Sequence, residues 1–339
     1  MRKQICVNIT VLLVNLITQL SMSWNESHFL ITYIEGGLMV SSEYKKGIFL
    51  ALGAYILWGI LPIYWRLIDE IGAFEILAFR IIFSVIFMIF VLIIGKNQRN
   101  AFFRDVNQLV SHPVQLIAII VAGYVITVNW GTFIWAVSNG HVLQSSLGYY
   151  INPLVSIVLA LIFLKERFNK FEWLAIIFAL VGVLYMTIKI GEFPFISLLL
   201  AFSFGIYGLL KKIVHIDAIS SITIECIVTA PAGLIYVIYL WQQQHMTFGL
   251  NISSFWLLFS GAITAIPLIL FSAGAKRIPL SLTGFIQYVG PTIMFILGIF
   301  VFKEPFNTDQ LITFIFIWIG IVLYSISQYV QIKKNPVVK

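Results

Sequence analysis

Residues 149–168 and 287–306 of this chain have the sequences YYINPLVSIVLALIFLKERF and QYVGPTIMFILGIFVFKEPF. Both contain, in the same order, a Pro, an apolar run, Lys-Glu, one further residue and a Phe. Six identities share one offset of 138 residues: Tyr150, Pro153, Lys165, Glu166, Phe168 and Gly182 recur as Tyr288, Pro291, Lys303, Glu304, Phe306 and Gly320. So many matches at a single offset indicate that the chain contains an internal repeat.

The composition shows what surrounds these apolar runs. Of the 339 residues, 60% are hydrophobic and 10% are charged, whereas a soluble domain carries about 25% charged residues. A helix needs about 20 mostly apolar residues to span a bilayer. Ten segments meet this requirement: 47–67, 74–95, 114–138, 142–164, 171–189, 194–213, 218–241, 253–275, 279–302 and 309–331. We therefore expect an all-α membrane protein with ten transmembrane helices.

Lys and Arg are distributed unevenly between alternate joints of these spans. If the end near residue 47 is cytoplasmic, three basic residues face outward, namely Arg66, Lys189 and Lys303, and fifteen face inward. The inward residues are Lys45, Lys46, Lys96, Arg99, Arg104, Lys165, Arg167, Lys170, Lys211, Lys212, Lys276, Arg277, Lys333, Lys334 and Lys339. Such a bias sets membrane orientation. It predicts a multi-pass protein of the cell (plasma) membrane with both termini cytoplasmic, and it explains the net charge of +7 without nucleic acid.

The repeat divides the ten spans into two halves, 45–190 and 191–332, followed by a tail at 333–339. A weaker match at an offset of 146 supports this division, because Trp58, Gly59 and Arg66 correspond to Phe204, Gly205 and Lys212. Five spans are an odd number, so the second half enters the membrane the other way up. We expect two inverted five-helix repeats, which are a hallmark of secondary transporters.

The N-terminal extension, residues 1–44, does not fit either repeat, and three interpretations stay open. A basic start (Arg2, Lys3) and an apolar run over 5–20 are typical of a signal peptide, although several polar residues dilute the run. The segment could instead be a genuine extra piece. In the third interpretation the true start is Met39, because the Glu-Gly-Gly string just before it can be encoded by a purine-rich sequence like a bacterial ribosome-binding site.

Several motifs then point to a family. They are Ala54-Tyr55, Trp58-Gly59-Ile60, Glu75-Ile76-Leu77 with Arg80, Asn129-Trp130, Phe133-Ile134-Trp135-Ala136-Val137, Ser146-Leu147-Gly148-Tyr149, Ile151-Asn152-Pro153-Leu154, Glu166-Arg167-Phe168, Gly284-Phe285, Gln287-Tyr288 and Gly290-Pro291-Thr292. In these residues the chain resembles the EamA-domain branch of the drug/metabolite transporter superfamily, and closely its RarD-type permeases. The likeness covers about residues 45–330 and implies ten helices, two EamA repeats and a permease role.

Pro153 and Pro291 are the clearest mechanical feature. A Pro inside a helix removes one hydrogen bond and clashes with the carbonyl four residues earlier, here that of Tyr149 and Gln287. Helices interrupted at corresponding positions of two halves point to a transport site. The alternative is that both prolines only produce packing kinks, which are common in membrane helices.

Polar and aromatic side chains near these prolines are candidates for a substrate cavity. These candidates are Tyr149, Tyr150, Asn152, Gln287 and Tyr288, together with Asn129 and Trp130 in the third span and Glu75 near the outer end of the second. The alternative for Asn129 is a hydrogen bond to a neighbouring helix, which is typical of membrane asparagines.

Arg80 and Glu225 complete the candidates as charges inside predicted spans. A charge near the bilayer centre costs about 2.5–3.5 kcal/mol on insertion scales, so it faces the bundle interior and marks a functional site by default. We expect the two to contact each other, with Glu225 binding a proton or a cationic substrate and Arg80 an anionic group. The alternative is a salt bridge that only holds helices together.

These features predict a permease, a secondary transporter that moves a small organic solute or drug-like metabolite across the cytoplasmic membrane by alternating access. The alternatives are a channel-like or sensory membrane scaffold and, with less support, an intramembrane enzyme. The sequence has no HExxH, GxSxG or phosphate-binding glycine loop, and its two cysteines form no metal-type cluster. We therefore expect no enzyme activity, cofactor or metal. The expected partners are a small-molecule substrate and the lipid bilayer, and a coupled proton and a homodimer stay open.

Overall fold

A computed structural model describes residues 42–68, 70–139, 141–191, 193–303 and 308–334. Met39 and most of the N-terminal extension lie outside these residues, and so does Glu304. Within the described ranges the chain is helical and contains no strand. Ten of its helical segments are long and apolar enough to cross a membrane, which confirms the predicted all-α membrane fold.

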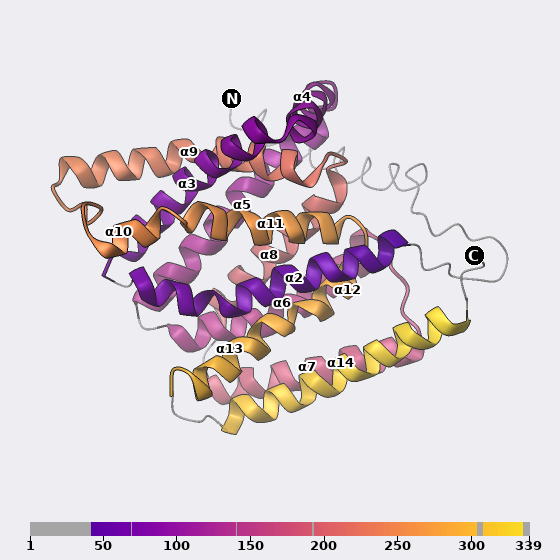
Figure 1. Cartoon of the computed structure of the whole chain (residues 1–339). Helices are drawn as coiled ribbons and strands as arrows, with labels where there is room; N and C mark the ends of the chain where they lie inside the picture. Colours follow the sequence, from indigo (N-terminus) through magenta and orange to yellow (C-terminus); the bar gives the residue numbers. More distant parts are fainter. Residues whose placement is uncertain (1–41, 69, 140, 192, 304–307, 335–339) are drawn as a thin grey trace, which may run out of the picture.

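The helices run roughly along one direction, side by side (Figure 1). The first half contains α2 (Ser42–Trp65), the short helix η1 (Arg66–Ile68), α3 (Ala73–Ile94), α4 (Lys96–Val110), α5 (Pro113–Ser138), α6 (Val142–Phe163) and α7 (Lys170–Ile190). The second half contains α8 (Phe195–Ile213), α9 (Ala218–Gln242), α10 (Ile252–Leu257), α11 (Ser260–Ala275), α12 (Leu280–Gln287), α13 (Val289–Phe300) and α14 (Thr308–Lys334). α10 with α11, and α12 with α13, each make up one spanning segment.

Helix packing follows a twofold pattern. Equivalent helices of the two halves pair directly, α3 with α9 and α7 with α14. Other contacts occur twice with the roles exchanged: α6 packs on α8 as α12 and α13 pack on α2, and α5 packs on α8 as α11 packs on α2. The predicted inverted five-helix repeats are therefore present.

Two equivalent glycines show how closely the halves approach each other. A Cβ atom on Gly182 of α7 would lie 2.9 Å from the carbonyl oxygen of Thr313, and one on Gly320 of α14 would lie 2.8 Å from that of Ala175. Real Cβ atoms essentially never come so close to a backbone oxygen. Small residues at helix contacts are the usual way for membrane helices to pack tightly, and here the repeat supplies one from each side.

α4 is an addition to the predicted architecture. The sequence predicted only a polar joint after the second span, but the joint is a helix that does not meet the requirements for a span. Its Leu109 belongs to the core. The buried carboxylate of Asp105 accepts a hydrogen bond from the backbone N–H of Asp217 (2.9 Å), so α4 is attached to the start of α9.

The two prolines have different effects on their helices. α6 continues without a break through Pro153, whereas α12 ends at Gln287 and α13 begins at Val289, so that the second half is interrupted at Tyr288. α6 is therefore not interrupted at Pro153, and the kink expected at this proline stays a prediction. Pro153 alone does not end a helix whose other residues keep their bonds.

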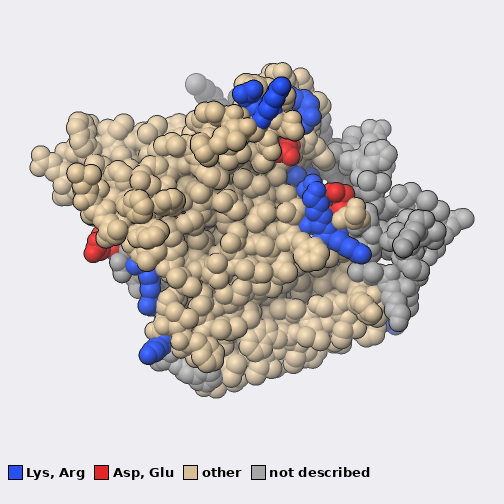
Figure 2. All heavy atoms as spheres, viewed as in Figure 1, with Lys and Arg blue, Asp and Glu red and all other residues tan. Residues whose placement is uncertain are grey.

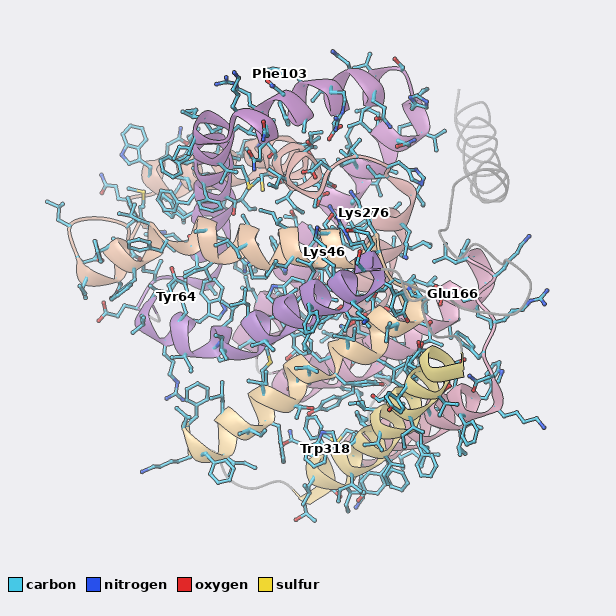
Figure 3. The ribbon with its side chains drawn as sticks, turned by 45° about the vertical axis from the view of Figure 1, so that its right-hand side comes forward. Lys46, Tyr64, Phe103, Glu166, Lys276 and Trp318 are labelled. Atoms are coloured by element: carbon cyan, nitrogen blue, oxygen red, sulfur yellow. The ribbon has the colours of Figure 1, made fainter. Side chains whose placement is uncertain are left out.

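The two ends of the bundle differ in charge. Lys46, Lys276 and Glu166 lie toward one end of the helices, and Tyr64 lies toward the other (Figure 3). On the face shown in Figure 2, Lys and Arg gather over α4 and around the start of α2, and a broad uncharged surface separates them from a smaller charged group near the end of α2. We call the end that holds Lys46 and Lys276 the Lys-rich end.

Candidate functional site

A cavity of about 450 Å³ lies between the two halves. Its volume is within the range of about 300–1,000 Å³ that is typical of small-molecule sites. α2, α3, α5 and α6 supply its wall from the first half, and α8, α12 and α13 from the second. The lining residues are Tyr55, Trp58, Leu61, Pro62, Trp65, Arg66, Arg80, Asn129, Trp130, Phe133, Ile134, Val137, Ser145, Gly148, Tyr149, Asn152, Leu200, Phe204, Gln287, Gly290, Pro291 and Met294.

The cavity extends from mid-helix to one end of the bundle. α2 contributes residues from Tyr55 to its last residue Trp65, and Arg66 follows at the mouth. α5 contributes its last three turns, as far as Val137. Both helix ends lie opposite the Lys-rich end. The cavity therefore opens away from the Lys-rich end.

Arg80 is held on the wall by two aromatic rings and one hydroxyl. Its guanidinium carbon lies 4.1 Å from the ring centre of Trp130 and 5.1 Å from that of Trp65. Its Nε donates a hydrogen bond to Oγ1 of Thr264 on α11 (3.1 Å). Arg80 is the eighth residue of α3, about 10 Å along the helix axis from its start. Its charge is thus fixed deep in the bundle, and no carboxylate of the described residues pairs with it.

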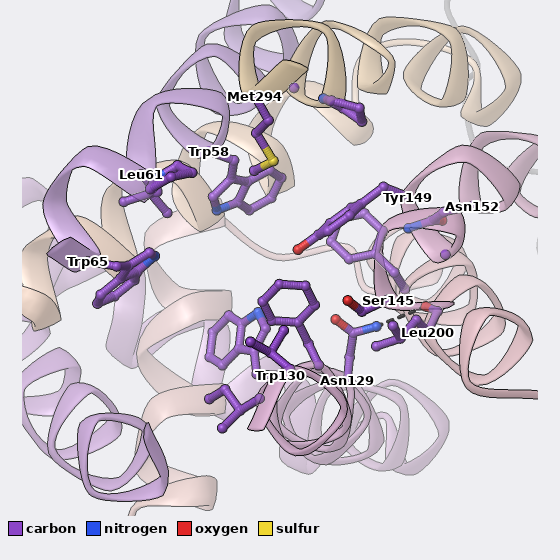
Figure 4. A pocket seen from close by; sticks show the side chains of 18 of the residues that line it. Trp58, Leu61, Trp65, Asn129, Trp130, Ser145, Tyr149, Asn152, Leu200 and Met294 are labelled. Atoms are coloured by element: carbon purple, nitrogen blue, oxygen red, sulfur yellow. Dashed lines mark hydrogen bonds between the residues drawn. The ribbon is translucent and has the colours of Figure 1, made fainter. Parts of the chain in front are cut away.

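Three polar side chains on the wall have different partners. Nδ2 of Asn129 donates to the carbonyl of Leu200 and to Oγ of Ser203 (2.8 Å each), so this residue also joins α5 to α8. In Figure 4 the hydroxyl of Tyr149 points into the space between Trp58 and Trp130. Oδ1 of Asn152 is buried and has no hydrogen-bond partner among the described residues.

The structure brings together six of the ten predicted cavity residues and one of the two prolines: Arg80, Asn129, Trp130, Tyr149, Asn152, Gln287 and Pro291. Pro153 and the other four residues lie elsewhere. Glu75 accepts hydrogen bonds from the backbone N–H groups of Thr247 (2.9 Å) and Phe248 (2.8 Å), and so fixes the loop after α9. Tyr288 donates through its hydroxyl to the carbonyl of Tyr150 (3.2 Å), and both are buried away from the cavity.

Glu225, the fourth residue, is paired with a lysine. Its carboxylate forms an ion pair with Nζ of Lys211 and accepts hydrogen bonds from Oγ of Ser221 (3.0 Å) and the hydroxyl of Tyr207 (3.1 Å). The lysine and glutamate side chains are 1% and 4% exposed. The predicted contact between Arg80 and Glu225 is therefore wrong: within the described residues no hydrogen bond or ion pair joins them.

The charge count groups Lys211 with the basic residues of the cytoplasmic side, but its side chain is buried inside the bundle at the last turns of α8. The loop from α8 to α9 is short, so the end of α8 lies beside the first turns of α9. Lys211 and Glu225 lie on either side of this loop, and that spacing was a signal for their pairing. A buried ion pair is stable only with good geometry and further hydrogen bonds, which Ser221 and Tyr207 provide.

A second, small cavity of about 20 Å³ is bordered by Glu225, Thr264 and Trp130. This volume holds one water molecule. Trp130 borders both cavities, and Thr264 is the hydrogen-bond partner of Arg80. This one water-sized cavity thus lies between Trp130 and Thr264, which hold Arg80, and the Lys211–Glu225 pair.

The Lys-rich end is closed by contacts between the halves. The Glu166 carboxylate accepts hydrogen bonds from the backbone N–H groups of Leu280 (2.7 Å) and Ser281 (3.2 Å) and from Oγ of Ser281 (2.5 Å), which caps the start of α12. Nε of Arg277 contacts the Glu43 carboxylate at 2.7 Å. An acidic residue at a helix start is favoured by the helix dipole. Glu166 therefore caps a helix of the other repeat.

Lys276 adds a half-buried amine to this end. Its Nζ donates to the carbonyl of Ile216 (2.5 Å). Burial lowers the pKa of Lys276 to about 7, and the nearby positive charge of Lys211 acts in the same direction. The amine is therefore partly neutral near physiological pH.

The chain is similar to known proteins both in sequence and in structure. Residues 45–188 and 194–326 each match the EamA-like transporter family. The chain is 39% identical over 292 residues to "Uncharacterized transporter YojE" of Bacillus subtilis (strain 168), covering 86% of this chain and 97% of the relative. It is 40% identical over 288 residues to "Protein RarD" of Escherichia coli (strain K12), covering 84% and 96%.

More distant similarities agree. The chain is 28% identical over 280 residues to "Chloramphenicol-sensitive protein RarD" of Pseudomonas aeruginosa, covering 82% of this chain and 93% of the relative. A crystal structure with 14% sequence identity superimposes with a TM-score of 0.60, covering 84% of this chain and 98% of that chain. At this identity the superposition concerns the fold alone.

Proposed function

Because this chain belongs to the EamA-like transporter family, as a RarD-type member, we propose that it is a secondary transporter that moves a small organic solute across the cytoplasmic membrane by alternating access. One observation carries the proposal: a cavity of ligand size between two inverted repeats is open at one end of the bundle and closed at the other. A carrier that works by alternating access needs both a cavity that fits its ligand and access to that cavity from one side at a time.

The repeat supplies the physical basis for alternation. One fold in two orientations has two nearly equivalent shapes, one open to each side of the membrane. The hydrogen bonds of Glu166 and the ion pair of Arg277 with Glu43 are polar contacts at the Lys-rich end that can break and re-form on the timescale of collective helix motions. Large apolar interfaces such as that of α7 with α14 would stay packed.

We place the Lys-rich end in the cytoplasm, because basic residues are retained on that side of a membrane. The start of α2 and the end of α14 then both lie on the cytoplasmic side. With this orientation the cavity faces the exterior, and the contacts of Glu166 form the closed inner gate. The opposite, inward-facing shape would require these contacts to open.

Proton coupling is supported by the Lys211–Glu225 pair. Protonation of Glu225 would neutralise one partner of a buried ion pair and leave the charge of Lys211 uncompensated, which is costly. The proton would therefore change the relative stability of shapes that keep the pair buried and shapes that expose it. The water-sized cavity beside Glu225 provides a place for a proton carrier next to the carboxylate.

A channel and an enzyme are the alternatives. A channel would be open to both sides at once, whereas the cavity is closed at the Lys-rich end. The names of the relatives and the family point to a transporter rather than to an enzyme.

Cysteine accessibility tests the proposal without knowledge of the substrate. In a chain without Cys6 and Cys226, single cysteines replace Met294 on the cavity wall, Lys189 and Gln243 at the proposed outer end, and Asn97 at the inner end. An impermeant thiol reagent added outside should label all except the Asn97 position. Reagent trapped inside should label the Met294 position only when outside labelling falls. Simultaneous labelling of that position from both sides would indicate a channel, and outside labelling at Asn97 would overturn the orientation.

A further inference from the structure

The charge of the large cavity is one-sided. Among the described residues that line it, the charged side chains are Arg80 deep in the wall and Arg66 at the mouth, and no Asp or Glu takes part. Arg66 lies over the ring of Phe302, with 3.8 Å from its guanidinium carbon to the ring centre. The carboxylates close to the cavity are committed elsewhere: Glu75 binds a loop and Glu225 binds Lys211. A ligand inside meets positive charge only.

Arg80 has donors to spare. A guanidinium carries five N–H donors, and one of these, on Nε, is bonded to Thr264. The terminal Nη groups of Arg80 have no acceptor in the part of the chain that the structure describes. Two aromatic rings, those of Trp65 and Trp130, fix the guanidinium. Its free edge is thus pre-organised for a bidentate acceptor, and carboxylate is the common group with that geometry.

Aromatic side chains form a large part of the remaining wall. Trp58, Phe133, Tyr149 and Phe204 supply large flat surfaces, and Met294 adds a polarisable thioether. Aromatic groups favour offset-stacked or edge-to-face contacts with other rings. The cavity therefore suits a ligand with a planar apolar body in addition to the charged group.

An organic cation fits this wall poorly. Aromatic cages do bind quaternary ammonium groups through the ring faces. Here, however, the faces of Trp130 and Trp65 are already occupied by Arg80. A cationic ligand would also be repelled by the arginine and would find no carboxylate.

We propose that the transported ligand is an aromatic carboxylate, with its carboxylate bound by the Nη groups of Arg80 and its ring held by the aromatic wall. The inference rests on the proposed transporter function and names the substrate class of the same cavity.

The test compares ligands that share a ring and differ in charge. Purified full-length protein in lipid nanodiscs is titrated by calorimetry with three series: indole-3-acetate, indole-3-acetamide and tryptamine; benzoate, benzamide and benzylamine; and 1-naphthoate, 1-naphthamide and 1-naphthylmethylamine. In at least one series the carboxylate should bind tenfold or more tightly than its amide, and the amine should bind least. Equal or tighter binding of amides or amines in every series, or no carboxylate binding in any series, would overturn the proposal.

Substitutions of Arg80 test whether this residue causes the preference for carboxylates. Arg80→Gln should reduce carboxylate affinity by tenfold or more and leave amide affinity within about threefold, because only the charged acceptor loses its partner. Arg80→Lys should retain part of the preference, since it keeps the charge without the planar fork. Arg99→Gln removes the same charge from an exposed position on α4 and should change nothing. Carboxylate preference that survives in Arg80→Gln would sink the assignment, and the ring series in the unmodified protein decides if that variant does not fold.

This outcome is separable from the transporter proposal. Equilibrium binding does not need the protein to alternate, and cysteine accessibility does not need a ligand. Loss of the carboxylate preference with alternating accessibility intact would remove only the substrate class. The reverse result would remove only the transport mechanism.

Discussion

The same proline motif has different effects in the two halves of the molecule. α6 contains Asn152-Pro153 and continues, whereas the second half contains Gly290-Pro291 and is broken at Tyr288. Glycine in a helix costs about 1 kcal/mol relative to alanine, and proline removes a hydrogen bond. In the second half the glycine and the proline are adjacent, as Gly290 and Pro291, so both costs fall on the same turn of the helix. The proline therefore sets where a helix can break, and its neighbour decides whether it does.

A second difference concerns charge. The offset of 146 residues that relates the first helices of the halves takes Lys211 to Trp65 and Glu225 to Phe79. The buried ion pair of α8 and α9 thus has two aromatic residues at the matching places of α2 and α3. Conversely, Arg80 corresponds to Cys226. The halves share a backbone pattern, and each carries its own buried charge: Arg80 on the cavity wall and the Lys211–Glu225 pair beside it.

The largest expected effect removes one member of that pair. Glu225→Gln leaves Lys211 buried without a counter-ion and should destabilise the protein by about 3–5 kcal/mol, seen as a lower melting temperature in detergent. The double variant Lys211→Met with Glu225→Leu makes this place as apolar as its counterpart in the first half. It should regain most of the stability, seen as a return of the melting temperature toward that of the parent. An unchanged melting temperature for Glu225→Gln would show that the pair is not a closed ion pair.

The next effect concerns the inner gate. Glu166→Ala removes three hydrogen bonds to Leu280 and Ser281, and loss of a charged acceptor costs about 1.5–3 kcal/mol. The equilibrium should shift about 10- to 100-fold toward the inward-facing shape. A cysteine at Met294 then labels from inside instead of outside.

The matched control for the gate is Glu43→Ala. It removes an exposed ion pair with Arg277 between the same two halves, and such pairs are worth about 0–1 kcal/mol. Its labelling should stay within a few-fold of the parent. Equal shifts in both variants would mean that any contact between the halves holds the gate, with no special role for the helix cap.

A smaller effect exchanges the neighbours of the prolines. Gly290→Ala should favour a continuous helix by about 1 kcal/mol, since a Cβ there meets only the carbonyl of Tyr55, at 3.5 Å. Hydrogen exchange of the amides from Tyr288 to Thr292 should slow about fivefold. Asn152→Gly should have the opposite effect on α6. If neither exchange rate changes, the break is imposed by packing and not by the local sequence.

The smallest effect is a pH dependence. Lys276 has a pKa of about 7 in the closed end, lowered by burial and by Lys211, while Glu225, Asp217 and Asp105 act in the opposite direction. A solvated lysine titrates near 10.4. Between these two pH values Lys276 is mostly neutral in the closed shape and protonated in the open shape. The stability of the closed shape relative to the open shape therefore rises with pH above about 7 and does not change with pH below about 7.

The corresponding measurement follows inside labelling of the Met294 cysteine from pH 7 to 9. It should fall by about threefold per pH unit, less than the full tenfold of linkage because solvent screens a half-buried charge. Lys276→Met should abolish the slope. A slope of opposite sign would mean that opening buries this amine further.

Much of the fold could be predicted from sequence. The ten spans follow from hydropathy, since a bilayer requires long apolar helices, and the repeat follows from identities at one offset. The candidate site was predictable only in part. Asn129, Tyr149 and Gln287 could be selected because they are polar or aromatic residues inside predicted spans, at mid-span or close to the two prolines. The partners of Glu225 and Glu166 depend on which helix ends meet, and no periodicity contains that information.

The hydroxyl of Tyr288 donates to the carbonyl of its own repeat equivalent, Tyr150. A donor and an acceptor are not interchangeable, so this one bond makes true twofold symmetry impossible in any single state. The carbonyl of Tyr288 is meanwhile occupied by the amide and hydroxyl of Thr292. Under alternating access, the reversed bond from Tyr150 to Tyr288 would belong to the shape that faces the other side. The direction of this one hydrogen bond would then have two values, and each value would correspond to a cavity that opens to one particular side of the membrane.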